Sequence, residues 1–261
     1  MTTGYPKFDG FSLQDDNFIM SEIVYRTIPT RQIESDKVLR RPGVKVLSAD
    51  FTLRKIQMKG SIVADTVDAL RTKIDELHAN VTRKESGILY VESDRSATAL
   101  VDSVAIGDPF YSQTYVPVEI DFFMADPFFY GAQQTADVTI TSGALSQTET
   151  ITISGSIFAE PSITYYSPVD TGNTTTSGIS ITYAETGEII TWSGTLGNTT
   201  LAYDSTVSFD YVSHLVKEGT ASVSPKGTFA QWSPGAQSYT VTFSGANQGG
   251  TLRFAYQPRY L

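Results

Sequence analysis

The 261-residue sequence contains no cysteine and only two histidines, His78 and His214. The lack of cysteine excludes disulfides, a thiolate nucleophile and Cys-ligated zinc or iron–sulfur centres, so any metal site would consist of carboxylates. Long hydrophobic runs are also missing, because no apolar stretch approaches the roughly 18 residues of a membrane span. The first residues, MTTGYPKFDGFSLQDD, lack the basic and apolar regions of a secretory signal. We therefore expect a soluble protein without membrane insertion or a cleaved export signal.

Catalytic motifs are absent as well. The sequence has no HExxH zinc motif, no GxSxG nucleophile elbow, no GxxxxGK phosphate loop and no GxGxxG turn after a strand. Neither histidine stands in a context that would make it the base of a serine nucleophile. Two pairs of acids have the composition of a glycosidase site, Asp121 with Asp126 and Glu185 with Glu188, but solvated surface acids are the commoner explanation. The sequence therefore predicts a protein that is not an enzyme and needs no cofactor.

Positive charge is scarce. Lys and Arg number 19 against 28 Asp and Glu, which gives a formal charge of −9 and a pI near 4.7. Tight binding to nucleic acid rests on Lys and Arg that displace counterions, so this balance disfavours a partner held through its phosphates. DNA could still pass such a protein without being held.

Composition changes near residue 132 and divides the chain into two β-rich bodies. Residues 1–132 contain 34 charged side chains, whereas residues 133–261 contain only 13. Ser plus Thr changes in the opposite direction, from 20 to 40, as exposed strands and their turns favour. Two bodies of about 130 residues fit the usual size of a domain. We therefore predict an N-terminal domain over 1–132 and a C-terminal domain over 133–261.

The N-terminal domain combines predicted strands with one helix at about 65–83. The apolar positions of this helix are spaced by three and four residues, which forms one buried stripe: Val67, Leu70, Ile74, Leu77 and Val81. Asp65 is the expected N-cap, with Asp68 three residues later. Strands are expected on both sides of the helix, including one over 50–63 with a single buried face. The domain is therefore predicted to be a sheet packed against one helix.

The segment at about 29–48 has little periodicity and an excess of cations. Its acids are Glu34 and Asp36, and its cations are Arg31, Lys37, Arg40, Arg41 and Lys45. So long a stretch without secondary structure is uncommon inside a compact domain and is usually functional or disordered. A solvated flexible loop and a partner-binding arm are equally compatible with these residues alone.

The C-terminal domain is predicted to be almost purely β. Segments such as ADVTITS, ETITISGS, GISITYA, EIITWSG and SYTVTFSG alternate apolar and polar residues between turn residues. Many short strands at this spacing indicate a β-sandwich or jelly roll. Trp192 and Trp232 could form a sugar-stacking surface on such a sandwich, although core packing is the commoner role of tryptophan in an alternating strand.

Five segments occur together and in an order that is typical of one known family. They are FDGFSL at 8–13, the stretch over 40–77 that begins RRPGVKVLS, PVEIDFFMADPFFYG at 117–131, GTFAQWSPGAQSYTVTFSG at 227–245 and AYQPRYL at 255–261. In this order the chain resembles the distal tail protein (Dit) family of long-tailed bacteriophages with flexible tails. No single motif is specific, but the set covers nearly the whole chain.

This resemblance implies a structural role at the tail tip. In the family, an N-terminal β-sandwich with a helix assembles into a ring that continues the tail tube. For this chain, the ring is expected to be a homohexamer. An extended arm embraces the neighbouring subunit, and in this sequence it would fall at about 29–48. The candidate interface residues are Arg31, Lys37, Arg40, Arg41 and Lys45. The C-terminal domain resembles the family's galectin-like sandwich at the ring periphery, where receptor-binding proteins attach.

The expected fold class is therefore mainly β: an N-terminal β-sandwich with one α-helix and an extended arm, then a C-terminal galectin-like or jelly-roll β-sandwich. The expected partners are copies of the same chain, the tail tube protein, a tail-tip hub protein and receptor-binding proteins, while DNA passes through the lumen without specific binding. The expected location is the distal end of the tail in the virion, after synthesis in the host bacterial cytoplasm. The alternative function is a carbohydrate-binding protein that recognises host cell-surface glycans through the C-terminal β-sandwich.

Overall fold

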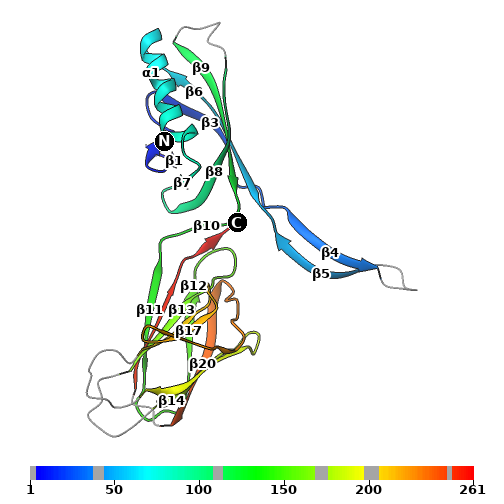
Figure 1. Cartoon of the computed structure of the whole chain (residues 1–261), viewed down its shortest axis with the longest axis vertical. Coiled ribbons are helices and arrows are strands. Elements are labelled where there is room, and N and C mark those ends of the chain that lie inside the picture. Colours follow the sequence, from blue (N-terminus) through cyan, green and yellow to red (C-terminus); the bar gives the residue numbers. More distant parts are fainter. Residues whose placement is uncertain (1–3, 38–43, 108–113, 168–175, 197–205, 246–248) are drawn as a thin grey trace. The chain divides into compact units, whose positions relative to one another are not determined.

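The chain folds into two compact units (Figure 1). The computed structural model describes residues 4–37, 44–107, 114–167, 176–196, 206–245 and 249–261. Unit 1 comprises residues 1–130 together with Tyr260 and Leu261, and unit 2 comprises residues 131–259. The predicted division after residue 132 differs from this by two residues at the junction and by the return of the last two residues to unit 1.

Unit 1 is built on a nine-stranded sheet with the main order β2-β1-β7-β8-β9-β6-β3. Off this path, β10 pairs with β8, and β22 pairs with β10. The strands are β1 (Lys7–Phe8), β2 (Phe11–Ser12), β3 (Phe18–Val24), β6 (Arg54–Val63), β7 (Ser86–Glu92), β8 (Arg95–Ile106), β9 (Tyr115–Met124), β10 (Phe129–Tyr130) and β22 (Arg259–Tyr260). In β9, buried residues alternate with more exposed ones, and the buried set is Val116, Val118, Ile120, Phe122 and Met124. One face of the sheet therefore forms the core of unit 1.

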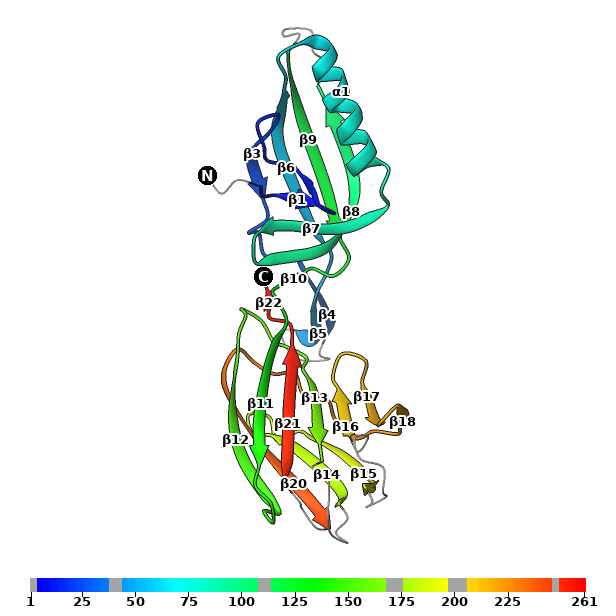
Figure 2. The same cartoon turned by 90° about the vertical axis from the view of Figure 1, so that its left-hand side faces the viewer.

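A single α-helix covers that face of the sheet. It is α1 (Val67–Leu77), which continues into a π-helical turn, η1 (His78–Thr82), and Figure 2 shows it running alongside β8 and β9. Leu70, Leu77 and Val81 are buried, which confirms the predicted apolar stripe. No helix among the described residues is long and apolar enough to span a membrane.

The helix begins one position later than expected. Thr66, not Asp65, is the N-cap, because its side-chain oxygen accepts a hydrogen bond from the Ala69 amide at 3.2 Å. Two neighbouring residues were both chemically suitable caps, and the direction in which the chain enters the helix decides between them.

The cationic segment of unit 1 forms a β-hairpin rather than an irregular loop. Its strands are β4 (Arg31–Lys37) and β5 (Val44–Phe51), which make a separate two-stranded sheet. In Figure 1 this hairpin projects from the rest of unit 1. The strand predicted over 50–63 is wrong at its start, because β5 ends at Phe51 and the next strand begins only at Arg54. The hairpin had no burial periodicity to detect, since almost all of its residues are exposed.

Unit 2 consists of a six-stranded sheet, β11-β21-β13-β16-β17-β18, and a five-stranded sheet, β12-β20-β14-β15-β19. The first contains β11 (Gln134–Ile140), β13 (Ser162–Tyr166), β16 (Thr206–Asp210), β17 (Leu215–Glu218), β18 (Ala221–Val223) and β21 (Gly250–Tyr256). The second contains β12 (Ser146–Ile153), β14 (Thr176–Tyr183), β15 (Ile189–Leu196), β19 (Lys226–Gly227) and β20 (Gly235–Gly245). The predicted mainly β fold with two sheets in this domain is confirmed. The short strands β17, β18 and β19 were not predicted, because they are too short and polar to show alternation.

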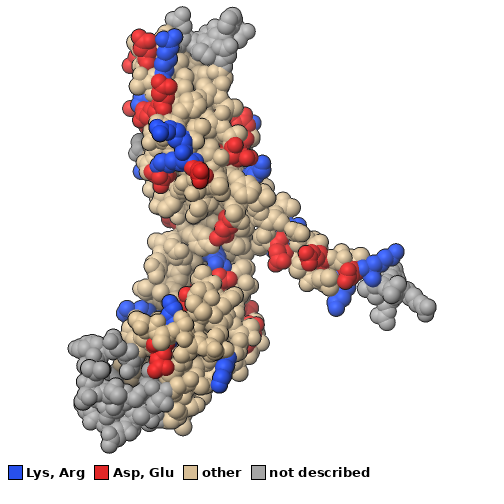
Figure 3. Space-filling model, in the orientation of Figure 1, with Lys and Arg blue, Asp and Glu red and all other residues tan. Residues whose placement is uncertain are grey.

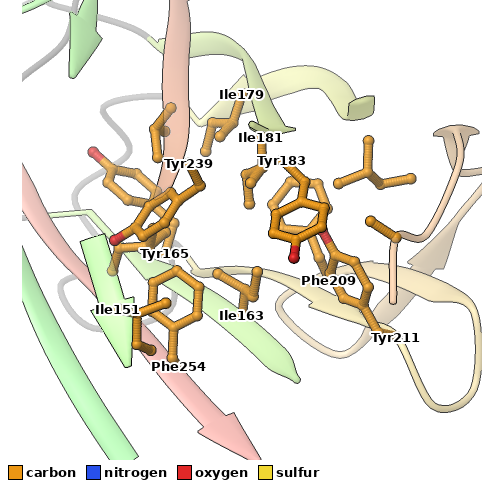
Figure 4. Packing of buried hydrophobic residues seen from close by; sticks show 14 of the residues in the cluster. Ile151, Ile163, Tyr165, Ile179, Ile181, Tyr183, Phe209, Tyr211, Tyr239 and Phe254 are labelled. Atoms are coloured by element: carbon orange, nitrogen blue, oxygen red, sulfur yellow. The ribbon is translucent and has the colours of Figure 1, made fainter. Parts of the chain in front are cut away.

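The core of unit 2 is unusually aromatic. Figure 4 shows buried isoleucines packed among tyrosine and phenylalanine rings, with Tyr239 and Phe254 side by side. The centroids of these two rings are 4.8 Å apart, and the Trp232 ring stacks on Tyr183 at 4.9 Å. The Tyr183 hydroxyl donates to the side chain of Gln237 at 2.8 Å, so its polar end is satisfied inside the core.

Candidate assembly interface

The β4–β5 hairpin has two chemically different faces, which are set by its register. Directly opposed residues of an antiparallel ladder share a face. On one face the opposed pairs are Arg31 with Phe51, Ile33 with Ala49, Ser35 with Val46 and Lys37 with Val44. We call these residues the apolar face.

The other face of the hairpin is mostly acidic and polar. Its opposed pairs are Gln32 with Asp50, Glu34 with Ser48 and Asp36 with Lys45, and we call these residues the acidic face. The register shifts between Glu34 and Ser35, which leaves Leu47 as the extra residue of a β-bulge. Figure 3 shows acidic groups distributed along the hairpin.

The apolar face is open to solvent. Ile33 is 60% exposed, Val44 61% and Val46 54%, and the bulged Leu47 is 54% exposed. A two-stranded hairpin alone is marginally stable in water, and grouped exposed apolar side chains mark interaction sites. The hairpin therefore has the composition of a protein-binding surface.

A buried guanidinium fixes the root of the hairpin. Arg54, the first residue of β6, is 3% exposed. Its Nη1 donates to the Pro127 carbonyl at 3.0 Å, and its Nη2 donates to the carbonyls of Tyr25 and Thr27, both at 2.7 Å. The guanidinium carbon lies 4.8 Å from the centroid of the Phe129 ring. Arg54 thus ties the segment that precedes the hairpin to the segment that ends unit 1.

Arg54 carries its charge without a carboxylate partner. Within the described ranges, no Asp or Glu forms an ion pair with it. Burial lowers the pKa of the Arg54 guanidinium. The three carbonyl dipoles and the face of the Phe129 ring offset the cost of removing this cation from water. A cation held in this way fixes the positions of its carbonyl partners, and so it fixes where the hairpin leaves unit 1.

Two further contacts close the root. The Thr52 amide and hydroxyl both donate to the Thr30 carbonyl, at 2.8 and 2.9 Å. The Arg31 guanidinium carbon lies 4.4 Å from the centroid of the Phe51 ring, and that ring packs edge-on against Phe128 at 5.6 Å. Polar and aromatic contacts therefore anchor the near end of the hairpin, while the rest of its apolar face remains exposed.

The predicted interface residues do not form one cluster. Arg31 and Lys37 lie at the two ends of the apolar face, whereas Lys45 lies on the acidic face. The other two, Arg40 and Arg41, lie outside the described residues. On the described part of the hairpin, two of the candidate cations therefore flank apolar residues, and a third lies on the opposite face.

Sequence reasoning did not identify the apolar members of this surface. Ile33 and Val46 are separated by the turn, and unbroken alternation from Ala49 would have placed Val46 on the opposite face. Only the bulge at Leu47 brings Val46 to the face of Ile33. The role of Arg54 also left no local signal, because its three carbonyl partners come from distant parts of the chain.

The other candidate sites are decided by burial and contacts. Trp192 is 1% exposed and Trp232 is 0% exposed, so core packing is confirmed for both and a sugar-stacking surface made of these two rings is wrong. In the part of the chain that the structure describes, no group of three or more His, Asp or Glu side chains is placed to hold a metal ion.

Comparisons with known proteins relate both units to one kind of molecule. Residues 8–124 match the family model of the phage tail protein RIFT-related domain. The crystal structure of the SPP1 Dit (gp 19.1) protein matches with a TM-score of 0.69 and 15% identity over 98% of each chain. That protein is described as a paradigm of the hub adsorption apparatus in phages that infect Gram-positive hosts. This match shows a shared fold over nearly the whole chain.

Two structures of the phage p2 baseplate in its activated conformation are more distant. The structure with Sr matches with a TM-score of 0.41 and 10% identity over 94% of this chain and 92% of that chain. The structure with Ca matches with a TM-score of 0.37 and 11% identity over 88% of this chain and 87% of that chain. These low scores carry no argument about the fold. No curated protein sequence matches the chain.

Proposed function

Because residues 8–124 form a phage tail protein RIFT-related domain and the whole chain has the Dit fold, we propose that this chain is a structural protein of a bacteriophage tail. It acts at the distal end of the tail as a non-enzymatic hub that joins the tail tube to the baseplate or tip. The match at 15% identity supports the fold alone, so the role at the tail tip rests on the family of unit 1 together with the surface of the hairpin.

The hub is a ring of identical chains, expected to be a homohexamer, and the β4–β5 hairpin is the arm that binds the neighbouring copy. The observation that carries this proposal is the anchored hairpin with an exposed apolar face. Arg54 holds its root, while Ile33, Val44 and Val46 protrude into solvent. Grouped exposed apolar side chains of this kind mark a surface that a second protein covers, and closed rings of one chain are a common way to cover it.

The remaining partners follow from the same position in the tail. One end of the ring contacts the tail tube protein, the other end contacts a tail-tip hub protein, and unit 2 offers an attachment point for receptor-binding proteins. DNA passes through the lumen, and the formal charge of −9 supports passage without tight binding. The protein is made in the host cytoplasm and functions in the virion.

The test is the mass and shape of the purified chain. Size exclusion with light scattering, across a range of concentrations, is expected to give a discrete species of about six chains, and electron microscopy is expected to show a ring with an open centre. Ile33→Asn together with Val46→Asn places two polar side chains on the apolar face. Burial of each of these side chains is worth about 1.5–3 kcal/mol, so the dissociation constant of each interface should rise at least about tenfold.

The matched control is Ser48→Asn, which introduces the same side chain on the acidic face of the same hairpin. It is expected to assemble like the unaltered protein. Assembly of the apolar-face variant at unchanged concentrations would contradict the assignment of the arm. A strict monomer at every concentration would contradict self-assembly of the ring.

A further inference from the structure

Unit 2 contains a pocket of about 550 Å³, within the volume range of small-molecule sites. Its lining includes Phe158, Glu160, Glu188, Tyr211, His214 and Phe229. Aromatic rings and carboxylates dominate this set, and none of its members belongs to the hairpin described above.

One wall of the pocket depends on an unusual backbone position. In the turn after β16, Asp210 Oδ1 accepts hydrogen bonds from the amides of Val212 at 3.1 Å and Ser213 at 3.4 Å. The next residue, His214, has a φ of 55°, which is uncommon for a side chain other than glycine. This position stacks the His214 ring on Phe229, with centroids 5.3 Å apart and planes at 26°.

The aromatic wall is continuous with the core. Phe229 packs edge-on against Tyr211 at 5.1 Å, and Tyr211 packs edge-on against Trp232 at 6.3 Å. Tyr211 is 2% exposed and Trp232 is 0% exposed. Close packing holds these rings in single positions, so the wall exists before any ligand binds.

One carboxylate of the pocket lining, that of Glu160, is already paired with a guanidinium group of this chain. Arg259 Nη2 lies 2.6 Å from Glu160 Oε2, and the two side chains are only 12% and 20% exposed. The Arg259 guanidinium carbon also lies 5.5 Å from the centroid of the Phe158 ring. A planar cation between a carboxylate and an aromatic ring is a favourable arrangement for arginine.

The second carboxylate of the pocket has no such cation. Glu188 Oε2 accepts a hydrogen bond from the Thr186 hydroxyl at 2.9 Å, and the described residues provide it with no ion pair. Glu188 lines the same pocket as the rings of Tyr211 and Phe229. The pocket therefore combines one neutralised carboxylate with one carboxylate beside rings and without a counter-ion.

We propose that this pocket binds the guanidinium group of an arginine presented by a partner protein, with Glu188 as its ion-pair partner and Phe229 in the adjacent wall. A carboxylate together with an aromatic ring is also how this chain holds the guanidinium of Arg259, through Glu160 and Phe158. A saccharide fits less well, because it carries no positive charge to pair with the Glu188 carboxylate.

This inference goes beyond the tail role and does not depend on ring assembly. The probes are N-acetyl-arginine amide and its neutral analogue N-acetyl-citrulline amide, which has nearly the same shape. Saturation-transfer NMR of the probe, with the full chain as receptor, works for a monomer and for a large assembly alike. Arginine is expected to bind with a dissociation constant of about 1–10 mM, as suits a ligand of this size, and citrulline at least about tenfold more weakly.

Glu188→Gln is expected to weaken the binding of the arginine probe by about tenfold. The control, Glu85→Gln, removes the same charge from an exposed glutamate of unit 1 and should leave binding unchanged. Tryptophan fluorescence in urea checks that the variants remain folded, since both tryptophans lie in unit 2.

Three results would overturn the proposal. They are equal binding of arginine and citrulline, unchanged arginine binding by Glu188→Gln, and no saturation transfer to either probe. Methyl glycosides, tested in the same way, cover the rival ligand class: transfer to a glycoside that is lost in Glu188→Gln would assign the pocket to saccharides instead. The comparison of arginine with citrulline uses the unaltered chain, so it does not depend on the folding of a variant.

Discussion

Replacement of Arg54 by methionine tests whether a buried cation holds the root of the hairpin. Methionine keeps an unbranched apolar side chain of similar length but donates no hydrogen bonds. The change removes the three bonds from Arg54 to the carbonyls of Tyr25, Thr27 and Pro127 and leaves those carbonyls without this donor. It also removes the contact with the Phe129 ring.

The magnitude follows from two opposed contributions. Hydrogen bonds from a charged donor contribute about 1.5–3 kcal/mol each, so three of them amount to about 4.5–9 kcal/mol. Removal of the cation recovers its desolvation cost, which is several kcal/mol for a group that is only 3% exposed. We expect the difference, a loss of about 2–4 kcal/mol, in the free energy of unfolding of unit 1.

The two units can be followed separately. Trp192 and Trp232 both lie in unit 2, so their fluorescence reports on unit 2 alone, whereas far-ultraviolet circular dichroism reports on both units. At a urea dependence of about 1.5 kcal/mol per M, the unit 1 transition of Arg54→Met should move down by about 1–3 M. The fluorescence transition of unit 2 should stay in place.

The control is Lys55→Met, which makes a similar change at the next residue of the same strand. The Lys55 side chain is 65% exposed and pairs with Asp102 at 3.0 Å, so its loss should cost less than about 1 kcal/mol. A unit 1 transition of Arg54→Met within about 0.5 kcal/mol of the unaltered protein would refute the reasoning. Hydrogen exchange should also quicken at the amides around the root in Arg54→Met but not in Lys55→Met.

Two further predictions concern alkaline pH and the helix cap. Burial raises the pKa of Tyr211 and Tyr239, so folded unit 2 keeps protons that the unfolded chain loses. The contribution of these two protons to the stability of unit 2 should be fully present below the unfolded pKa of about 10. Above that pH, the free energy of unfolding should fall by up to about 2.7 kcal/mol per pH unit. Equal urea midpoints at about pH 9 and pH 11, measured by fluorescence, would contradict this prediction. Thr66→Ala should lower the free energy of unfolding of unit 1 by about 1 kcal/mol, measured by circular dichroism, whereas Asp65→Ala should leave it almost unchanged. The reverse order would assign the cap to Asp65.

The features that the sequence predicted correctly are those that depend on neighbours in the chain. The helix was found because Leu70, Leu77 and Val81 recur at the helical period, and that period is required wherever one face of a helix is buried. The strands of unit 2 were found for the same reason at period two. The position of Trp192 in an alternating strand was sufficient to place it in a core, and Trp232, which precedes a Pro-Gly turn, is buried as well.

The sequence by itself therefore determined two β-rich bodies, one helix and a cationic segment whose conformation it left open. The hairpin escaped prediction because it buries neither face, so its sequence shows no alternation of apolar and polar residues. A single bulge at Leu47 decides which side chains share its apolar face. Only the tertiary structure brought Arg54 to the carbonyls of Tyr25, Thr27 and Pro127. Only the tertiary structure brought Glu188 beside Phe229. Both sites join residues that are far apart in the chain, and local periodicity carries no information about such contacts.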